Sequence, residues 1–425
     1  MNKKILLFSA ALSPLLLFGA GYKIPEQSSD SVALGSSNIA KSYGADASFY
    51  NPANMSFLDR DSYFIEGGLT YIYLGKTKFK NYSKVAGTKD QTSKKERFVT
   101  PTFHFVTKEY NKFRYGVSLA VPAGIAMKWD GDYAKATSHL FMLKIIELSS
   151  SAAYRVSDNF SIAAGARAVY SEGETENYIE NLNYKGININ ATRHMNGDSI
   201  DFGYLVATTY KPLESLSFSA TYKSKVNLTL KGNSRITSTS TPPVPPGLGL
   251  NGNYEGGASI TVPLPATLTL ASAYEYDKFD FMFAFERTFW SKLKELDFDY
   301  DGKVPFAKAF EEPQQKNWKD ANAYRIGFGY RVNDNLRLMA GFSYDEAATK
   351  SQYVGFELPD TKAYVYSTGF SYKIDKSKEI AGSFLYQDRQ NRRVDKQGKT
   401  FLDTVDGKFQ SGKGMLTNLT FKYKF

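Results

Sequence analysis

Four arginines could bind a carboxylate because of where they fall in the sequence. Each stands in a segment where apolar residues alternate with polar or small ones, and each belongs to the polar or small set: Arg114, Arg167, Arg325 and Arg337. A guanidinium binds a carboxylate through two parallel hydrogen bonds. The arginines therefore indicate either a carboxylate-binding cavity or a lattice of salt bridges, with Glu66, Glu275 and Glu286 as available partners.

Groups suited to catalysis are few. The 425-residue chain has three histidines, His104, His139 and His194, and no cysteine. None of the histidines has a recognisable serine or carboxylate companion motif. The lack of cysteine excludes disulfides, thiolate metal sites and cysteine nucleophiles. We predict that the protein is not an enzyme and uses no metal or cofactor; a lipid-modifying enzyme built on a barrel is the alternative from another class.

The segments that position these residues repeat with a period of two. Their apolar stripes are Tyr63, Ile65, Leu69, Tyr71 and Tyr73; Phe113, Tyr115, Val117, Leu119 and Val121; alternate residues of 160–170 and 216–222; Leu264, Ala266, Leu268 and Leu270, leading to Tyr274 and Tyr276; and alternate residues of 279–285, 324–330 and 336–344. This period is typical of strands with one apolar face. Aromatic residues recur at both ends of the stripes, as the girdles of a membrane β-barrel require.

Short and long connections alternate along the chain. Tight polar turns fall at 109–112, 156–159, 211–216, 276–279, 332–335 and 374–378, and long loops are expected near 81–97, 122–140, 173–197, 231–257, 300–320, 347–360 and 391–412. Outer-membrane barrels join their strands in this way, with periplasmic turns and extracellular loops. We predict an all-β, membrane-spanning antiparallel β-barrel of about 14 strands over residues 59–425, with both termini periplasmic.

The first 20 residues have the layout of a secretory signal peptide. The basic start "MNKK" precedes the apolar run "ILLFSAALSPLLLF" and the small residues "GA". We expect cleavage after Gly19 or Ala20. The mature protein is therefore predicted to leave the cytoplasm and to lie in the bacterial outer membrane.

Residues 21–58 do not alternate, and the chain ends on a strand-like stripe. The early segment is rich in Ser and Gly with scattered apolar residues, which suits an N-terminal hatch that plugs the barrel. The last segment, "MLTNLTFKYKF", is predicted to be the final strand, which closes the barrel against the first. Its terminal Phe425 is the kind of residue that the barrel-assembly machinery reads, so that machinery is an expected partner.

Several sequence segments together resemble the FadL family of outer-membrane long-chain fatty-acid transporters, whose relatives include TodX-type hydrocarbon channels. They are "GYKIPEQSSDSVALGSSNIA", "ADASFYNPANMSFL", "GVSLAVPAGIAMKW", "ITVPLPATLTLASAYEY" and "NWKDANAYRIGFGYRVNDNLRLMAGFSYD". The similarity covers essentially the whole mature chain. It implies a fourteen-stranded barrel plugged by the hatch, which imports hydrophobic molecules by passive diffusion.

The resemblance also implies a route and its residues. Ligand is captured at extracellular loops, binds in the lumen near Tyr22 and leaves sideways through a gap in the wall. The hatch motif Asn51, Pro52 and Ala53 is expected to face that gap; a simple turn that leads into the first strand is the alternative. For a carboxylate ligand, the four arginines are the expected lumen partners.

The segment "TPPVPPGLGL" at 241–250 is apolar and stiffened by proline within an expected extracellular loop. Exposed apolar patches mark binding surfaces. We predict that Pro245, Pro246, Leu248 and Leu250 belong to the capture loop; a rigid loop that packs on its neighbours is the alternative.

One departure from the family bears on the ligand. Where the fatty-acid importer carries basic residues at the outer end of its fifth strand, this chain has Glu172, Glu174, Glu176 and Glu180. An uncharged hydrocarbon or another lipid is therefore the alternative to a fatty acid, followed by a general porin.

The net charge of +10 is spread along the chain beside many acids, so no nucleic acid is expected. The expected surroundings of the protein are outer-membrane lipid and lipopolysaccharide, and we expect a monomer.

Overall fold

The computed structural model describes residues 21–425 apart from 185 and 411, so the predicted signal peptide lies outside the described residues. The strands are β1 (Phe64–Leu74), β2 (Lys78–Asn81), β3 (Gln91–Thr92), β4 (Glu96–Val106), β5 (Phe113–Lys128), β6 (Leu140–Ser157), β7 (Phe160–Tyr184), β8 (Ile187–Leu213), β9 (Leu216–Lys223), β10 (Val226–Thr241), β11 (Gly252–Leu264), β12 (Thr267–Tyr276), β13 (Phe279–Thr288), β14 (Glu295–Leu296), β15 (Phe298–Tyr300), β16 (Gln314–Gln315), β17 (Ala321–Arg331), β18 (Leu336–Asp345), β19 (Ala363–Lys373), β20 (Lys378–Arg389), β21 (Arg392–Lys396), β22 (Val405–Gln410) and β23 (Gly414–Lys424). The helices are α1 (Ser29–Ala33), α2 (Ala47–Tyr50), η1 (Pro52–Phe57), α3 (Asp132–Ser138), η2 (Pro246–Leu248), η3 (Trp290–Lys292), α4 (Ala307–Phe310) and η4 (Ser351–Tyr353). Among the described residues, no helix has both the length and the apolar character needed to cross a membrane.

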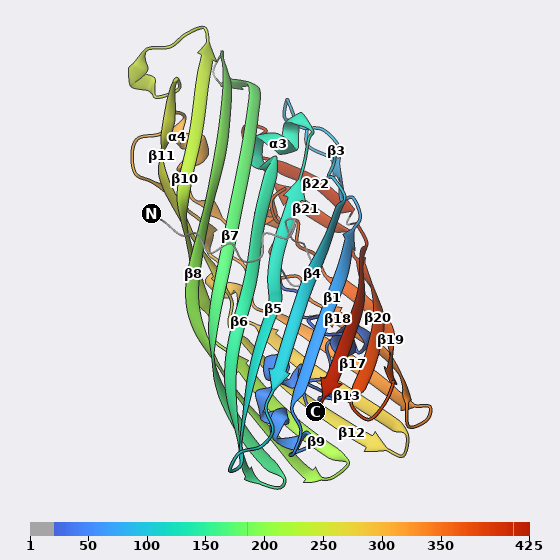
Figure 1. Ribbon diagram of the computed structural model, residues 1–425. Helices are drawn as coiled ribbons and strands as arrows, with labels where there is room; N and C mark the ends of the chain where they lie inside the picture. The colour runs from blue at the N-terminus through green and yellow to red at the C-terminus, as the bar shows by residue number, and fades with distance from the viewer. Residues whose placement is uncertain (1–20, 185, 411) are drawn as a thin grey trace.

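The large sheet closes on itself into an antiparallel barrel (Figure 1). β1 pairs with β4 on one side and with β23 on the other, so the first and last strands meet. Three barrel strands are interrupted, into β9 and β10, β11 and β12, and β13 and β15. The prediction of an all-β barrel of 14 strands is confirmed. We call the end with the tight turns the turn end, and the end with the long connections the loop end.

Alternation along the strands separates a lipid-facing surface from the lumen. On β8, Phe202 is 75% exposed and Ile200 64%, whereas Leu205 and Ala207 on the opposite parity are buried. Most predicted stripes face outward in the same way. The outward orientation predicted for Val121, Leu264 and Ala266 is wrong, since all three residues are buried. The strand pattern breaks there: β5 shifts register between Ala120 and Ala123, and β11 ends before β12 begins.

The loop predicted for 173–197 is wrong, because β7 and β8 run as paired strands to a hairpin whose ends are Tyr184 and Ile187. Much of 231–257 is likewise strand, within β10 and β11. These strands rise well above the rest of the barrel in Figure 1. Backbone ladders satisfy their own polar groups in water as well as in lipid. A polar composition therefore does not end a strand where the membrane ends.

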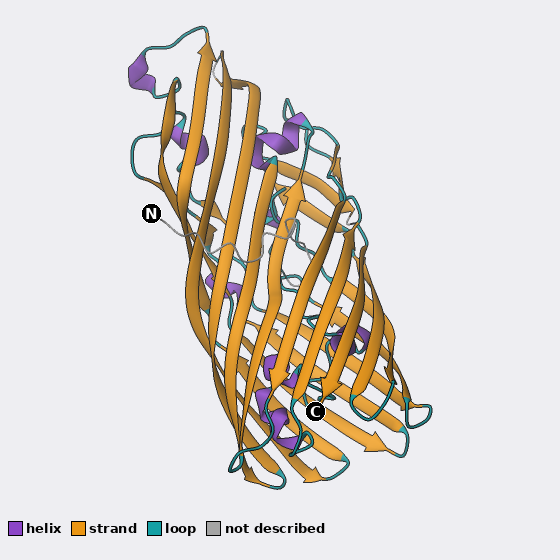
Figure 2. Cartoon of the chain, viewed as in Figure 1, coloured by secondary structure: helices purple, strands orange, loops and turns teal. Residues whose placement is uncertain are grey.

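Residues 21–58 bridge opposite walls of the barrel. Ser29 bonds Ser383 of β20 at 3.0 Å, Asn51 donates to Thr209 of β8 at 2.8 Å, and Lys41 donates to Asp280 at 2.8 Å. These contacts place the segment inside the ring of strands, where its short helices are visible in Figure 2.

The loop-end half of the lumen is filled by apolar side chains. This loop-end core contains all three tryptophans of the chain, Trp129, Trp290 and Trp318, together with residues such as Tyr22 and Phe356. Aromatic rings pack edge to face here, with the centroids of Trp290 and Trp318 4.9 Å apart. The barrel therefore has an apolar interior at the loop end rather than an open aqueous channel.

Candidate functional site

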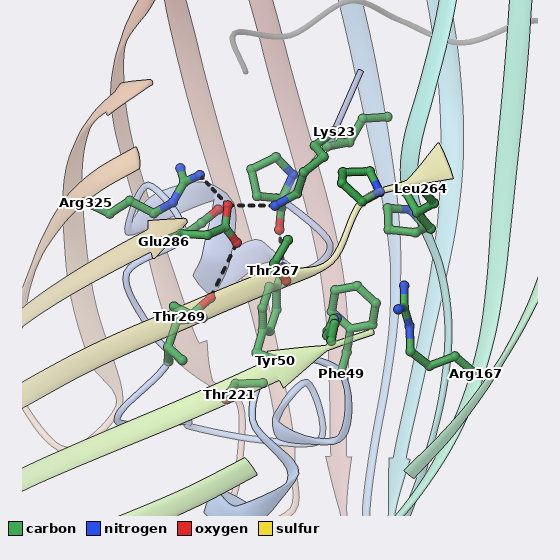
Figure 3. A pocket seen from close by; sticks show the side chains of 17 residues that line it. Lys23, Phe49, Tyr50, Arg167, Thr221, Leu264, Thr267, Thr269, Glu286 and Arg325 are labelled. Carbon is green, nitrogen blue, oxygen red and sulfur yellow. Dashed lines mark hydrogen bonds and ion pairs between the residues drawn. The ribbon is translucent and has the colours of Figure 1, made fainter. Parts of the chain in front are cut away.

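A pocket lies between the hatch segment and the barrel wall (Figure 3). Its wall comes from the hatch, β5, β7, β9, β11, β12, β13 and β17: Lys23, Ile24, Pro25, Ser36, Ile39, Phe49, Tyr50, Pro122, Arg167, Thr221, Lys223, Leu264, Pro265, Thr267, Thr269, Glu286 and Arg325. Apolar side chains and prolines line it together with four cations, Lys23, Arg167, Lys223 and Arg325. The chain has thus assembled a mixed apolar and cationic pocket from segments far apart in sequence.

Glu286 is the acid at one side of this pocket. Its Oε1 accepts from Lys23 Nζ at 2.7 Å and lies 3.6 Å from Arg325 Nη2. Thr269 donates to its other oxygen at 3.5 Å. Arg325 also contacts Asp345 at 3.3 Å. Both Lys23 and Arg325 therefore have carboxylate partners.

Arg167 also has a carboxylate partner, Glu147. Its Nε and Nη2 donate to the two oxygens of Glu147 at 3.0 and 2.7 Å, and its Nη1 donates to the Ser224 carbonyl at 2.8 Å. Both partners of this bidentate pair are buried. Such a pair orients the guanidinium firmly and leaves it little capacity for a further carboxylate.

Lys223 differs from the other cations of the pocket. Its Nζ lies 3.4 Å from the centroid of the Phe49 ring. Within the described part of the chain it forms no ion pair, although it faces the lumen beside Arg167 and Glu286. Sequence reasoning missed it, because the segment "YKSK" resembles a solvated strand end. Lys223 is the lining cation best placed to receive an anionic group.

The other predicted lumen residues lie outside the pocket. Tyr22 is buried beside it, where its ring meets Trp290 at 4.7 Å and its hydroxyl donates to the Pro263 carbonyl. Arg337 pairs with Asp30 of the hatch at 3.1 Å.

Arg114 forms hydrogen bonds with backbone carbonyls near the turn end. It donates to the carbonyls of Thr107, Met55, Asp59 and Ser62 at 2.6 to 2.9 Å. Of the four predicted arginines, Arg167 and Arg325 therefore line the pocket. Arg114 and Arg337 instead bind the hatch segment.

The predicted acidic partners also separate. Glu286 pairs with Arg325, whereas Glu275 pairs with Lys41 at 2.6 Å. Glu66 is buried, and neither of its oxygens has a hydrogen-bond partner among the described residues.

The hydrogen-bond ladder between the neighbouring strands β4 and β5 is incomplete. β4 and β5 pair only where Phe103–Val106 face Gly116–Leu119. Beyond that point β4 stays on β1 and β5 stays on β6, until Lys94 donates to the Lys128 carbonyl at 2.9 Å. We call the unpaired stretch between 96–102 and 120–128 the β4–β5 window. The register shift in β5 lies at its edge.

The hatch segment forms hydrogen bonds with the backbone of β5 along this window. Ile24 donates to the Pro122 carbonyl, and Gly124 donates to the Tyr22 carbonyl, both at 2.8 Å. The Gln27 side chain donates to the Val121 carbonyl at 2.9 Å and accepts from the Val121 N–H at 2.7 Å. The start of the hatch therefore takes the place of a neighbouring strand along β5.

Asn51, Pro52 and Ala53 lie deeper, towards the turn end. Asn51 is fully buried; its side chain donates to the Ile39 carbonyl at 2.9 Å and to Thr209, and accepts from Ala53 N–H at 3.1 Å. Pro52 begins η1 with Asn51 as its N-cap, where a missing N–H costs nothing. The motif fastens the hatch to β8 rather than lining the β4–β5 window itself.

The predicted capture loop joins β10 to β11. Leu248, in η2, is 59% exposed, whereas Leu250 packs against a loop-end cluster that includes Ile236 and Phe306. Pro245 is exposed and precedes Pro246, the first residue of η2. A second, apolar pocket lies well below this loop along β10 and β11 and is lined in part by Phe141, Met195, Leu230, Ile260 and Phe298.

The four glutamates of β7 do not face the lumen. Glu172, Glu174, Glu176 and Glu180 alternate with the buried residues Ser171, Thr175, Asn177 and Ile179. His104 faces inward, where its ring nitrogens lie 3.0 Å from Ser118 Oγ and from the Gln27 carbonyl oxygen. This histidine is held beside the β4–β5 window.

Comparison with known proteins agrees with this geometry. The family model described as outer membrane protein transport protein (OMPP1/FadL/TodX) matches residues 12–425. The long-chain fatty acid transport protein of Escherichia coli K12 is 23% identical, over 100% of this chain and 98% of its own. Outer membrane protein P1 of Haemophilus influenzae is 25% identical, over 67% of this chain and 65% of its own.

Two solved structures share the fold. A FadL homologue of Pseudomonas aeruginosa superposes with a TM-score of 0.81 at 20% identity, covering 95% of this chain and 99% of that one. The Pseudomonas putida toluene transporter TodX gives 0.69 at 18% identity, covering 94% and 98%. The family match spans nearly the whole chain, so this protein belongs to the OMPP1/FadL/TodX family of outer-membrane proteins that transport hydrophobic compounds.

Proposed function

We propose that this protein takes up long-chain fatty acids by passive diffusion. In this scheme the loop end is extracellular and both termini are periplasmic, so ligand enters through the loops and leaves sideways through the wall. The protein acts as a monomer among outer-membrane lipid and lipopolysaccharide. It needs no cofactor, because each step is binding or diffusion.

The observation that carries the proposal is the free ammonium of Lys223 in a pocket rich in apolar groups. The other three lining cations have carboxylate partners, whereas Lys223 has the Phe49 ring. A carboxylate that reached this pocket would gain a charge-assisted hydrogen bond. The glutamates of β7 face away from the lumen and do not oppose this interaction.

The apolar tail would lie against apolar surface in the direction of the loop end. The loop-end core and the second pocket supply apolar surface above Lys223. Pro245, Pro246, Leu248 and Leu250 are the proposed capture loop, and the exposed Leu248 gives that loop an apolar tip. A fatty acid would travel from there towards Tyr22 and then to the pocket.

Release requires the hatch to move. The pocket has a free volume of about 70 Å³, whereas small-molecule sites usually offer about 300–1,000 Å³. The movable boundary is the hatch segment 22–27, which fills the β4–β5 window. We assign Asn51, Pro52 and Ala53 to the anchor about which this segment shifts, since Asn51 is bonded to β8.

The test compares two ligands that differ in charge. Oleate and oleyl alcohol are titrated into the purified protein, its Lys223→Met variant and a Lys211→Met control; Lys211 lies over the Phe57 ring, 5.3 Å from its centroid and away from the pocket. Loss of a hydrogen bond to a charged group costs about 1.5–3 kcal/mol, or roughly 10- to 150-fold in affinity. We expect this loss for oleate with Lys223→Met only.

Two results would contradict the proposal. Equal oleate binding by wild type and Lys223→Met would remove the head-group role, and preference for the alcohol would favour an uncharged hydrocarbon. If neither ligand bound and small hydrophilic solutes crossed the reconstituted protein, the general porin would replace the importer.

A further inference from the structure

The outer face of β6, β7 and β8 carries a group of metal-ligating side chains beyond the lipid-facing band. Glu174 and Glu176 stand on β7, and His194 lies directly opposite Glu176 on β8. His194 is six residues beyond the exposed Ile200 of the lipid-facing band, which is about 20 Å along the strand. His139 reaches the same face from the residue that precedes β6.

The donor atoms are already close together. His194 Nδ1 lies 3.2 Å from Glu176 Oε1 and 3.7 Å from Glu174 Oε1, and His139 Nε2 lies 3.6 Å from Glu176 Oε2. Zinc bonds to nitrogen and oxygen are about 2.0–2.2 Å long, so the ligand atoms around a tetrahedral ion are about 3.3–3.6 Å apart. The ligand atoms of Glu174, Glu176 and His194 all lie within 4.8 Å of one another, close to what such an ion needs. His139 lies against the other oxygen of Glu176 and would move towards the ion to become the fourth ligand.

A second observation concerns the orientation of His139. Its Nδ1 lies 2.9 Å from the Trp129 carbonyl oxygen, to which an Nδ1–H can donate, and its Nε2 faces Glu176. Tyr178 packs edge to face on the imidazole at 4.7 Å, and its hydroxyl donates to Glu176 Oε2 at 3.5 Å. Metal-binding histidines are typically fixed in this way, by a carbonyl on the other ring nitrogen.

Neighbouring lysines do not neutralise the two carboxylates. Lys144 pairs with Glu172 at 3.5 Å, and Lys135 pairs with Glu180 at 3.0 Å. Within the described residues, the ion-pair partners of Glu174 and Glu176 are the two histidines. Two adjacent carboxylates without a lysine or arginine partner among the described residues form a site that a divalent cation would balance.

We propose that Glu174, Glu176, His194 and His139 form a binding site for a first-row divalent transition-metal ion of the zinc class. Imidazole nitrogens favour zinc, copper or nickel over calcium or magnesium. The ion would link β7 and β8 to the residue before β6, beside the apolar pocket whose lining includes Glu174 and Met195. The sequence predicted no metal site, because the donors lie on separate strands with no recognised spacing.

The test uses zinc chloride alone with the untagged, full-length protein in detergent. Isothermal titration should show one saturable ion per chain, with at least a tenfold loss of affinity for His194→Gln and for His139→Gln. Glu180→Gln is the matched control, since this acid lies on the same strand face but pairs with Lys135. Cobalt, which substitutes for zinc, should give the intense visible absorption of a tetrahedral site.

The substituted residues are at the surface or at its edge, and heat-modified mobility on gels will verify that each variant is folded. Absence of saturable zinc binding in wild type would overturn the proposal. So would equal zinc binding by wild type and His194→Gln, or displacement of zinc by an equal concentration of magnesium, because each points to simple attraction by acidic residues.

Discussion

The Gln27 side-chain amide pairs with both backbone groups of Val121, at 2.7 and 2.9 Å, as a neighbouring strand would. Val121 lies where β5 shifts register and loses β4. An unpaired backbone group within the hydrocarbon zone is costly. The hatch therefore supplies hydrogen-bond partners to the β5 backbone where the barrel strands leave it unpaired.

Replacing Gln27 with Ala should loosen the window selectively. Both backbone groups of Val121 lose a partner, at a cost of about 1–3 kcal/mol each. We expect amide exchange within 118–125 to quicken at least tenfold, measured by hydrogen exchange and mass spectrometry. Ser29→Ala, which removes a hatch contact to β20, should leave that segment unchanged. Protection equal to wild type in Gln27→Ala would show that the window does not depend on Gln27.

Asp30 should be the main electrostatic anchor of the hatch. It pairs with Arg337 of β18 at 3.1 Å and with Lys422 of β23 at 2.6 Å, and it is fully buried. Asp30→Asn removes the carboxylate partner of Arg337 and leaves Lys422 with Glu379 alone, and breaking a buried pair typically costs about 3–5 kcal/mol. We expect a lower denaturation midpoint and protease cleavage within 21–58.

The control for this anchor is Asp59→Asn. Asp59 pairs with Lys424, but both side chains are more than 40% exposed, and exposed pairs typically contribute less than about 1 kcal/mol. Similar midpoints for the two variants would contradict the anchor role of Asp30.

Much of the fold could be predicted because a membrane barrel imposes its period on every strand. Alternating apolar residues such as Leu69 and Tyr71 must face lipid, and this identified most strands. Strand ends were not predictable in the same way. Residues 173–197 are polar on their outer face, yet they continue the ladder, since hydrogen bonding between strands does not depend on lipid.

The candidate site was only partly predictable. Arg114 and Arg337 have the same sequence pattern as Arg167 and Arg325, but they meet other parts of the hatch. Gln27 and Lys223 gain their roles from partners about 94 and 174 residues away along the chain, Val121 and Phe49. Side-chain type and spacing along the chain hold no signal for such long-range contacts.

Acid should open the loop-end core through Glu357, which pairs with Lys316 between two loops. Burial raises the pKa of Glu357, and the charge and hydrogen bond of Lys316 lower that pKa by more, so it lies below the ordinary value. The pair therefore stabilises the loops above about pH 4.3, and this stabilisation is lost as pH falls through the lowered pKa.

Tryptophan fluorescence can follow this transition, because all three tryptophans of the chain lie in the loop-end core. We expect a red shift of wild-type emission below about pH 4, and an already shifted spectrum at pH 7 for Glu357→Gln. Glu255→Gln, at an exposed pair with Arg235, should behave as wild type. A wild-type spectrum for Glu357→Gln across the titration would contradict the prediction.

Phe425 should matter more for assembly than for the stability of the finished barrel. Its backbone exchanges two hydrogen bonds with Tyr63, at 2.8 and 3.1 Å, which a substitution of the side chain keeps. The residue is 53% exposed, and its ring stacks on Tyr63 and Tyr423 with centroids 5.3 and 5.2 Å apart. Phe425→Ala should therefore lower the amount of protein in the outer membrane several-fold with little change in the denaturation midpoint, whereas Tyr423→Ala, which also removes a stacking ring, should assemble normally. Equal losses of assembled protein in the two variants would mean that the ring acts by packing rather than by recognition during assembly.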